Sequence, residues 1–506
     1  MRILPNFAES FRFFFELSVE KKHCSWYTDY VCIYKREGGM KMLHFIPITE
    51  QHTEELSRYY ALCHYRVSDY SLGVKLMWRY MLESEFAIFA GCLVVRSKIR
   101  GRWTFDFPIA ISEDADMDKA FDAMARFCYE HFLPFELNAV PQEMLPMLTA
   151  RYTNIETRSQ RNLSDYLYLA EDFREFAGKK YAGQRNHIRK FHAKYPNAVF
   201  REFTEADAEK ITAFRYAFEK TFDKISYGAK NELERAWKML RFVGSPFFRC
   251  GGFELDGKII SLCISEVCGD TLIDHIEKAL PEYEGVYPAM VQAFAKMFTH
   301  DVKYINREDD AGSRGLRTSK MQYQPVQILD KISVRVRSEL YYIEKIPTIR
   351  TARLVMDAIR ETDIPAYNRL CLDDERNRYW GYDYREDCET PDEQYFYLDQ
   401  KKDFGSSQAM NFAIRLHETM IGELILYHFD FRGGVEIGVR ILPEYEKNGY
   451  ATEAYAAACE YALYAIGMNV VRGKCMKENL ASKKMLSAIL RPDGEDDTYF
   501  YFRKNV

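Results

Sequence analysis

Residues 443–455 read PEYEKNGYATEAY, and this stretch decides the fold of the C-terminal part of the chain. An apolar, strand-like run precedes it at Val435–Leu442, and a long segment of small and aromatic residues with helical character follows it. Gly449 and Ala451 stand at the turn between them, where small side chains leave backbone N–H groups uncovered. A helix that begins there adds partial positive charge. The stretch therefore predicts an anion site suited to a pyrophosphate.

Two further elements follow this turn at the spacing of one α/β unit. Met468–Cys475 is a short β-like run, and Met476–Leu486 follows it as a predicted helix. Asn479 or Ser482 can begin that helix, because both residue types accept a hydrogen bond from the free N–H groups of the first turn. The predicted order is thus strand, anion-binding turn, helix, strand, helix.

With these elements, residues 347–506 resemble the GNAT acyltransferase family, and within it the branch that acts on protein N-termini and similar amines. Ile349–Met356 resembles the opening strand of the family, and Asn411–Leu416 with Thr419–Leu426 resembles its central hairpin. The resemblance implies acetyl-CoA as the cofactor. It also implies contacts to acetyl-CoA from two groups of residues, one at the turn and one at the next helix: Lys447, Asn448, Gly449, Tyr450, Ala451 and Thr452, then Asn479 and Ser482.

The sequence departs from the family pattern at two places. Glu446 stands where the family often has Arg or Gln, and Leu486 stands where a tyrosine commonly protonates the leaving thiolate. A water or Tyr450 would then take the part of the proton donor. As the base, Glu436 on the strand before the turn is expected to accept the amine proton directly or through water, and Glu423 is the second candidate.

Composition bounds what else the chain does. Its 506 residues suggest about two to four domains, and 47% hydrophobic and 15% aromatic residues support packed cores. The formal net charge of −5 leaves binding to nucleic acid or an anionic membrane to a local patch. Twelve cysteines without repeated Cys-x-x-Cys or His/Cys spacing predict reduced thiols and no metal. No apolar run approaches the roughly 20 residues of a transmembrane span, so we expect a cytoplasmic protein.

A sequence pattern that recurs three times predicts the domain organisation. A strand followed by an acidic helix start recurs at Leu43–Leu56, Val199–Asp207 and Thr351–Asp363, which predicts three related α/β units. We expect one GNAT-like lobe over residues 40–170, a second over 171–345 and the acetyltransferase domain over 346–506. Within the first lobe, Phe86–Val95 is expected to form one strand, and Asn162–Ala170 is expected to close the lobe.

Residues 1–39 fit poorly with the rest of the chain. Arg36–Gly39, just before Met40, can be encoded by a purine-rich stretch of the kind that recruits bacterial ribosomes. We therefore expect translation to start at Met40 or Met42. The alternative is a short extension that packs its Phe cluster on the body of the protein.

Two segments of the N-terminal region concentrate polar residues. The first is a predicted basic helix, Gly178–Lys194, which could neutralise phosphates of RNA, CoA or a lipid head group, or could form a solvated face with Ile188 and Phe191 pointing inward. The second is Tyr304–Lys320, a strand end with a glycine-rich loop, which could be a site or a salt-bridged turn. The candidate polyanion or substrate residues are Lys179, Lys180, Arg185, Arg189, Lys190, Asn306, Glu308, Asp310 and Lys320.

Together with the turn at Glu284–Gly285, these segments resemble the phosphatidylglycerol lysyltransferase C-terminal-like domain family over about residues 42–340. The resemblance implies two GNAT-like lobes and a region similar to tRNA-dependent aminoacyltransferases, with aminoacyl-tRNA as a partner. The first hypothesis is an acyltransferase whose C-terminal domain acetylates an amine-bearing small molecule or a protein N-terminus. The second makes the N-terminal region a non-catalytic module that binds tRNA or another polyanion. A third makes both regions inactive scaffolds.

Overall fold

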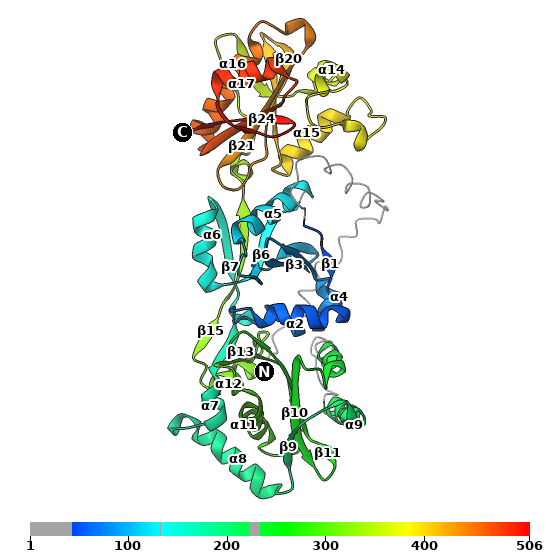
Figure 1. Ribbon diagram of the computed structural model, residues 1–506, viewed down its shortest axis with the longest axis vertical. Coiled ribbons are helices and arrows are strands. Elements are labelled where there is room, and N and C mark those ends of the chain that lie inside the picture. The colour runs from blue at the N-terminus through cyan, green and yellow to red at the C-terminus, as the bar shows by residue number, and fades with distance from the viewer. Residues whose placement is uncertain (1–42, 132, 222–232) are drawn as a thin grey trace, which may run out of the picture.

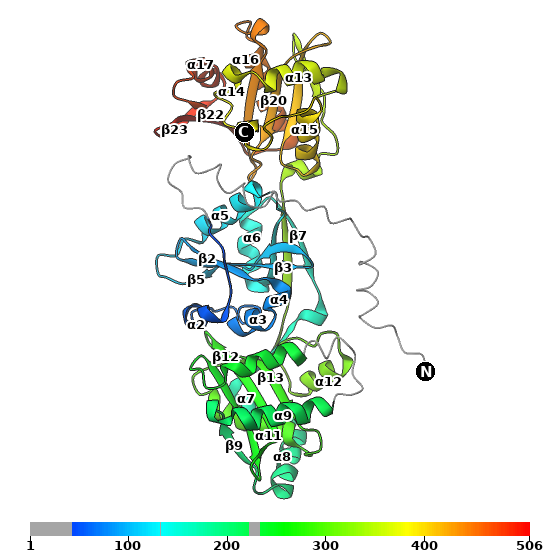
Figure 2. The same ribbon diagram turned by 90° about the vertical axis from the view of Figure 1, so that its right-hand side faces the viewer.

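The protein consists of three α/β units that follow one another along its long axis, as Figures 1 and 2 show. The computed structural model describes residues 43–131, 133–221 and 233–506. These residues form three mixed sheets of eight strands each. The expectation for residues 1–39 lies outside the described residues. Among the described helices, none combines the length and the apolar character that crossing a bilayer requires.

The first sheet forms the middle unit, and helices cover its faces (Figure 1). Its strands run in the order β1-β2-β3-β4-β6-β16-β7, and β5 pairs with β3. In chain order the strands are β1 Ile46–Pro47, β2 Glu85–Phe89, β3 Cys92–Ile99, β4 Arg102–Phe105, β5 Ile109–Ala110, β6 Phe135–Pro141, β7 Asn154–Ser159 and β16 Lys331–Arg337. The helices are α2 Thr53–Ala61, α3 Leu72–Met77, α4 Arg79–Leu82, α5 Met117–Glu130 and α6 Leu145–Arg151.

The second sheet forms the unit at the far end from the C-terminal domain (Figure 2). Its order is β11-β10-β12-β13-β14-β8-β15, and β9 pairs with β10. The strands are β8 Asp165–Leu169, β9 Val199–Glu202, β10 Phe248–Leu255, β11 Lys258–Ile259, β12 Ser261–Cys268, β13 Thr271–Ala279, β14 Tyr304–Asn306 and β15 Gln327–Leu329. The helices are α7 Ala170–Glu175, α8 Ala182–Lys194, α9 Ala208–Lys220, α11 Val286–Phe298 and α12 Arg314–Gln322.

The third sheet keeps nearly the order of the sequence, β17-β18-β19-β20-β21-β22-β24-β23. Its strands are β17 Ile349–Arg350, β18 Leu354–Ala358, β19 Met410–Leu416, β20 Thr419–Tyr427, β21 Gly434–Ile441, β22 Val470–Met476, β23 Arg491–Glu495 and β24 Tyr499–Asn505. The helices are α13 Ile364–Cys371, α14 Asp374–Asn377, α15 Tyr395–Gly405, α16 Tyr450–Glu460 and α17 Leu480–Ile489. The predicted hairpin is β19 and β20, so this part of the prediction is confirmed.

The three sheets repeat one arrangement. Each contains a parallel strand pair joined by a crossover helix: β4 and β6 through α5, β13 and β14 through α11, and β21 and β22 through α16. A parallel pair needs such a crossover, because a tight turn can join only antiparallel strands. The predicted mixed α/β class with three related units is confirmed by this repeat.

The first two sheets exchange strands, which the sequence did not indicate. Asp165–Leu169, expected to close the first lobe, instead pairs with β14 and β15 in the second sheet. Lys331–Arg337, expected in the second lobe, pairs with β6 and β7 in the first sheet. A border at residue 170 therefore does not separate the sheets, and the chain crosses between them twice. Phe86–Val95 also differs from the prediction: Ala90 and Gly91 adopt positive φ and divide it into β2 and β3.

Candidate active site

The third sheet opens into a notch between β21 and β22. These two strands pair in parallel only over residues 434–436 and 470–472, although both continue further, to Ile441 and Met476. Beyond Glu436 the strands therefore separate and leave room between them. Val435 and Ile437 pack in the core with α16, so the alternation of a strand directs Glu436 to the opposite face.

The predicted anion-binding turn lies at the end of β21 and is open. Gly449 is the N-cap of α16 with φ of 78°, a conformation that favours glycine, and no described side chain caps this helix. The first N–H groups of a helix have no partner within the helix. Asn448 turns its side-chain amide back to the carbonyls of Tyr445 and Glu446, at 3.2 and 3.0 Å. The backbone N–H groups that come next are consequently available to an anion.

Arg353, which sequence reasoning missed, supplies a cation at this turn. Its Nη1 donates to the carbonyl of Asn448 at 3.0 Å, its guanidinium lies 4.6 Å from the ring centroid of Tyr450, and its Nε lies 2.6 Å from Glu453 Oε2. The pairing neutralises the carboxylate of Glu453, which would otherwise repel an anion at the first helical turn. Arg353 and Asn448 stand 95 residues apart, so only the folded sheet brings them together.

The other predicted contacts to the acyl donor divide between the turn and α17. Lys447 is exposed with φ of 61°, and Ala451 and Thr452 lie in the first turn of α16. Asn479 caps α17, accepting a hydrogen bond from the Ser482 N–H at 3.0 Å. Of the two predicted start residues, Asn479 is the one that caps the helix, and its side-chain oxygen is engaged in that bond.

The notch ends at two buried polar atoms without a hydrogen-bond partner in the described chain, Glu436 Oε2 and Tyr455 Oη. Tyr455 is 1% exposed on α16, and its hydroxyl reaches the backbone of Gly473 on β22, where a larger residue would collide with it. Leu486 of α17 packs against the same glycine of β22, since its Cδ2 would be 3.1 Å from a Cβ at Gly473. Sequence reasoning missed Tyr455, because a helical tyrosine reads as ordinary core.

Glu436 and Glu423, the two predicted bases, have different surroundings. Burial opposes ionisation of Glu436, but the hydrogen bond from His428 Nδ1 at 3.0 Å and the charges of His428 and Lys474 bring its pKa down to about 2. Glu423 is fully buried, and its oxygens bond Tyr367, Asn411 and Arg440 at 2.6–2.8 Å. Glu423 therefore belongs to a closed ion-pair cluster and has no oxygen free for a substrate amine.

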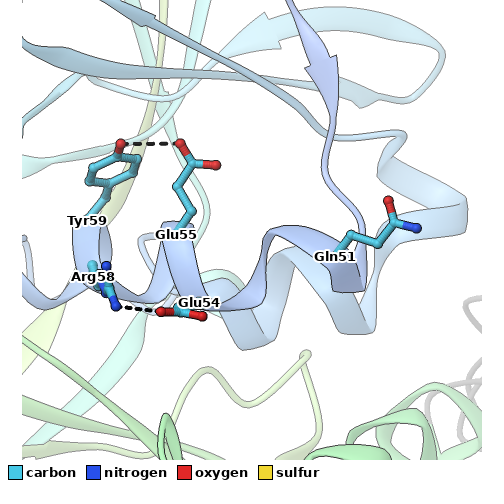
Figure 3. Close-up of a pocket in the computed structure, with 5 residues that line it drawn as sticks. All are labelled: Gln51, Glu54, Glu55, Arg58 and Tyr59. Carbon is cyan, nitrogen blue, oxygen red and sulfur yellow. Dashed lines mark hydrogen bonds and ion pairs between the residues drawn. The ribbon is translucent and has the colours of Figure 1, made fainter.

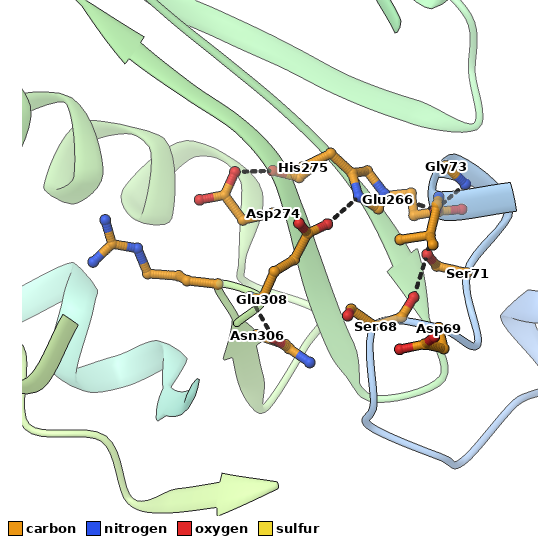
Figure 4. Close-up of polar contacts among 12 residues, drawn as sticks. Ser68, Asp69, Ser71, Gly73, Glu266, Asp274, His275, Asn306 and Glu308 are labelled. Atoms are coloured by element: carbon orange, nitrogen blue, oxygen red, sulfur yellow. Dashed lines mark hydrogen bonds and ion pairs between the residues drawn. The ribbon is translucent and has the colours of Figure 1, made fainter. Parts of the chain in front are cut away.

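Asn306 and Glu308, predicted in the N-terminal region, lie in a buried cluster between the first two sheets (Figure 4). Asn306 Nδ2 donates to Asp165 Oδ2 at 2.8 Å. Glu308 Oε1 lies 2.9 Å from His275 Nδ1, and the other ring nitrogen lies 2.7 Å from Glu266 Oε1. These residues are thus brought together, but in a network of satisfied hydrogen bonds.

This cluster joins the two lobes. Glu266 Oε1 also accepts from the N–H of Gly73, at 2.6 Å, and Figure 4 shows the strands of the second sheet facing the loop with Ser68 and Ser71 and the start of α3 at Gly73. Burial lowers the pKa of His275, but hydrogen bonds and charges of Glu266 and Glu308 outweigh it and raise the value to about 10. The imidazolium therefore bridges two carboxylates of the second lobe, and one of them, Glu266, carries the contact to Gly73 of the first lobe.

Asp310 and Lys320 brace the loop after β14. Asp310 is fully buried and accepts from Tyr166 at 2.5 Å and from Arg317 at 2.8 Å. Lys320 Nζ donates to the carbonyl of Arg307 at 2.6 Å. The turn is accordingly held by ion pairs and hydrogen bonds, which is the alternative that the sequence left open.

The basic residues of the predicted helix are exposed, on the turn Lys179–Tyr181 and on α8. Lys180 pairs with Asp172 at 2.9 Å, and Arg185 donates to the carbonyl of Gly178 at 2.7 Å, where it caps the preceding turn. Lys179 and Lys190 have no carboxylate partner among the described residues. Ile188 and Phe191 are buried, as predicted. The basic face is therefore separate from the buried cluster around Asn306.

A group of potential metal ligands lies in the second sheet, where Cys263, Asp274 and Glu277 bring their ligand atoms within 4.8 Å of one another. Burial raises the pKa of both Cys263 and Asp274, and the Cys263 thiol lies 3.2 Å from Asp274 Oδ1. Arg307 pairs with Glu277. Metal ligands must be deprotonated, so burial of Cys263 and Asp274 and the pairing of Glu277 with Arg307 both work against a metal ion here.

A surface depression over the start of the first lobe is lined by Gln51, Glu54, Glu55, Arg58 and Tyr59 (Figure 3). Its polar contacts join neighbouring turns of one helix: Arg58 to Glu54 at 2.5 Å and Tyr59 to Glu55 at 3.3 Å. Such exposed i, i+4 pairs are ordinary on helix surfaces. The depression therefore offers no convergent set of catalytic groups.

A splayed strand pair with an uncapped helix N-terminus beside it defines the class of protein: an acyltransferase. The comparisons agree, since the acetyltransferase (GNAT) domain family matches residues 353–489. The family described as phosphatidylglycerol lysyltransferase, C-terminal, matches residues 60–335, more than half of the chain. The chain belongs to this family and carries a GNAT domain after it, which confirms the predicted fusion.

Similar proteins each cover part of the chain. A conserved protein of unknown function from Bacteroides thetaiotaomicron, known as a crystal structure, has 24% identity and a TM-score of 0.52 over 58% of this chain and 100% of its own. This likeness shows the fold alone. The uncharacterized N-acetyltransferase YoaA of Bacillus subtilis is 26% identical over 146 residues, 28% of this chain and 80% of that protein. The uncharacterized protein MYCGA3080 of Mycoplasmoides gallisepticum is 24% identical over 180 residues, 34% of this chain and 56% of its own length.

Proposed function

We propose that the C-terminal domain transfers an acetyl group from acetyl-CoA to an amine, either on a small molecule or at a protein N-terminus. The observation that carries the proposal is the open N-terminus of α16 at Gly449, where no described side chain occupies the first N–H groups. A helix N-terminus of this kind binds phosphate groups through its N–H groups and its dipole. Lys447 adds positive charge beside it, and Arg353 neutralises the carboxylate of Glu453 there.

The notch supports the same donor. From Glu436 to the end of β21 at Ile441 the strand rises about 17 Å, at about 3.3 Å per residue. An extended arm that is anchored at the turn would run along this edge, where the strand's backbone groups have lost their partner strand. Its thioester end would then approach Glu436. The residues present therefore fit acetyl-CoA, which would supply the activated acyl group.

Calorimetry of the full chain with acetyl-CoA tests the proposal directly. We expect binding in the micromolar range, and acetyl-pantetheine, which lacks the pyrophosphate, should bind at least tenfold more weakly. Equal affinity for the two donors would contradict a pyrophosphate site at the turn. No heat with millimolar acetyl-CoA would contradict the acyl-donor assignment itself.

A second function is proposed for the N-terminal region, which is similar to tRNA-dependent aminoacyltransferases through its family. We propose that the exposed basic face of Lys179, Arg189 and Lys190 binds tRNA or another polyanion. Binding to phosphates should weaken with salt, by a slope that reflects the number of contacts. Arg189→Glu with Lys190→Glu should abolish salt-dependent tRNA binding, whereas Lys258→Glu, on the short strand β11, serves as a control. Unchanged tRNA binding in the double variant would refute this role. A test with aminoacyl-tRNA would then show whether the region also transfers the amino acid.

A further inference from the structure

The hairpin loop between β20 and β21 packs against the first lobe. Within it, Phe431 accepts a hydrogen bond from the Thr153 N–H at 3.3 Å and packs against Phe135 with ring centroids 5.6 Å apart. Arg432 lies 3.5 Å from Asp122 on α5. The first lobe therefore touches the segment of chain that directly precedes Glu436.

His428 is the residue of this hairpin that faces both the lobe and the notch. Its Nδ1 lies 3.0 Å from Glu436 Oε1, and its ring meets Tyr129 of α5 edge-on with centroids 4.6 Å apart. The ring of Tyr427, the preceding residue, packs against the His428 ring with centroids 4.7 Å apart. Its side chain is still 32% exposed, and because Nδ1 is engaged by Glu436, Nε2 is the ring nitrogen left to meet a ligand.

The hydrogen bond to Glu436 selects the tautomer. A carboxylate can only accept, so Nδ1 carries the proton and Nε2 of the neutral ring keeps its lone pair. Glu436, with a pKa of about 2, is a weak base but a lasting anion. An orienting carboxylate behind an imidazole is an arrangement that activates a histidine base.

We propose that Nε2 of His428 is the general base of the acyl transfer, that Glu436 is a positioning residue for it, and that Tyr129 of the first lobe holds the imidazole in place. This deepens the function proposed above and rests on it. The acceptor amine then enters from the face of the third sheet that meets the first lobe, and the N-terminal region contributes directly to the acetyltransferase site.

Atoms and protons balance in this step. The amine nitrogen attacks the thioester carbonyl carbon, a C–N bond forms and the C–S bond breaks. The proton lost by the amine passes to Nε2, and CoA leaves as a thiolate that regains a proton from the imidazolium or from water. The charged and titratable groups around the ring are Glu436 of β21, Tyr427 of β20, Tyr129 of α5 and Lys474 of β22.

The first test needs no acceptor. Nitrogen-15 NMR of the histidine rings, with the His428 signals assigned by their loss in His428→Gln, should show Nδ1 protonated and Nε2 unprotonated in the neutral form. Glu436→Gln should shift the ring toward the other tautomer. A neutral wild-type ring protonated at Nε2 would overturn the proposal, because such a nitrogen cannot accept the proton.

The second test is kinetic, with thiol release from acetyl-CoA followed in the presence of an amine from a screen, or with water as the acceptor. His428→Gln should lower kcat roughly a hundredfold, the size of a general-base contribution, and remove the acidic limb of the pH profile. The Kd for acetyl-CoA should stay unchanged. Glu436→Gln should keep the limb but move it to lower pH, and Tyr129→Leu should lower kcat about threefold.

His417→Gln is the matched control, since His417 is an exposed histidine at the other end of β20. A His428→Gln protein with the wild-type rate and pH profile would overturn the assignment. If acetyl-CoA fails to bind the wild-type protein, the proposed function falls, while the tautomer measurement still reports whether His428 and Glu436 form the pair.

Discussion

The three crossover helices occupy equivalent places in three sheets, yet their N-termini differ. Asp116 caps α5 by accepting a hydrogen bond from the Lys119 N–H at 3.0 Å. Gly285 precedes α11 with φ of 83°, and α8 lies so close that a Cβ there would be 2.5 Å from the carbonyl oxygen of His187. Gly449 precedes α16 with φ of 78°, and the nearest atom to such a Cβ is Arg353 Nη2 at 3.5 Å.

The difference teaches that the architecture alone does not make an anion site. In α5 a carboxylate already satisfies the first turn, and in α11 another helix covers it. Only at α16, among the described crossover helices, does the helix start next to a cation and open space. The repeat therefore supplies the geometry three times, and local residues decide where it can bind a ligand.

The largest effect should come from making α16 resemble α5. Gly449→Asp places a carboxylate where Asp116 stands, so it would cap the N–H groups and repel the pyrophosphate. Two lost charge-assisted hydrogen bonds, at about 2 kcal/mol each, correspond to a roughly thousandfold weaker Kd for acetyl-CoA. Calorimetry, or competition with a fluorescent CoA derivative, measures this Kd.

Gly467→Asp is the control for this variant. Gly467 has φ of 87° at the opposite end of the same helical run and has open space around it. The same backbone strain and charge are thus introduced far from the turn, and the Kd should change less than threefold. An equal loss of affinity in both variants would mean that strain, rather than the capped N-terminus, causes the effect.

The next effect separates the two glycines. Gly285→Ala adds strain from its positive φ and a collision with the backbone of α8, which together should cost about 3 kcal/mol. Gly449→Ala adds only the strain, about 1 kcal/mol. Hydrogen exchange of the α11 and α16 amides in urea reports each region separately. Similar losses of stability in the Gly285→Ala and Gly449→Ala variants would contradict the close contact between α8 and α11.

The sequence predicts the features that neighbouring residues determine, but not those that depend on contacts between residues far apart in the chain. The turn at Gly449, the cap at Asn479 and the hairpin β19–β20 follow from local patterns of glycine, cap residues and apolar alternation. The exchange of β8 and β16 between sheets does not, because each strand fits either sheet by its pattern. Arg353 and His428 reach the site only through strands that the fold brings together, so no spacing in the sequence could have indicated them, whereas Tyr455 lies on α16 itself and was missed because a helical tyrosine resembles ordinary core.

A smaller effect is expected from the cation at the open turn. Arg353→Gln removes the charge and leaves Glu453 unneutralised in the first turn of α16, so the Kd for acetyl-CoA should rise about tenfold, equal to about 1.4 kcal/mol. The salt dependence of binding should also become shallower. Arg350→Gln, an exposed arginine on the adjacent strand β17, is the control and should bind normally. If both variants bind alike, Arg353 serves the fold and not the ligand.

The smallest effect should come from α5, whose cap has no part in binding the acyl donor. Asp116→Ala frees the Lys119 N–H, and exchange of the α5 amides should become about fivefold faster, the size of an ordinary lost cap. The hydrogen bond lowers the pKa of Asp116 below its usual value. The capping hydrogen bond therefore stabilises α5 fully above the unfolded pKa of Asp116, and this stability is lost as the pH falls through the lower folded pKa. The difference in amide exchange between Asp116→Ala and wild type should accordingly vanish in acid. Acetyl-CoA affinity should stay at the wild-type value throughout. A loss of affinity would show instead that the cap of α5 supports the acetyltransferase domain through the contact of α5 with His428, and the three helices would then not be independent.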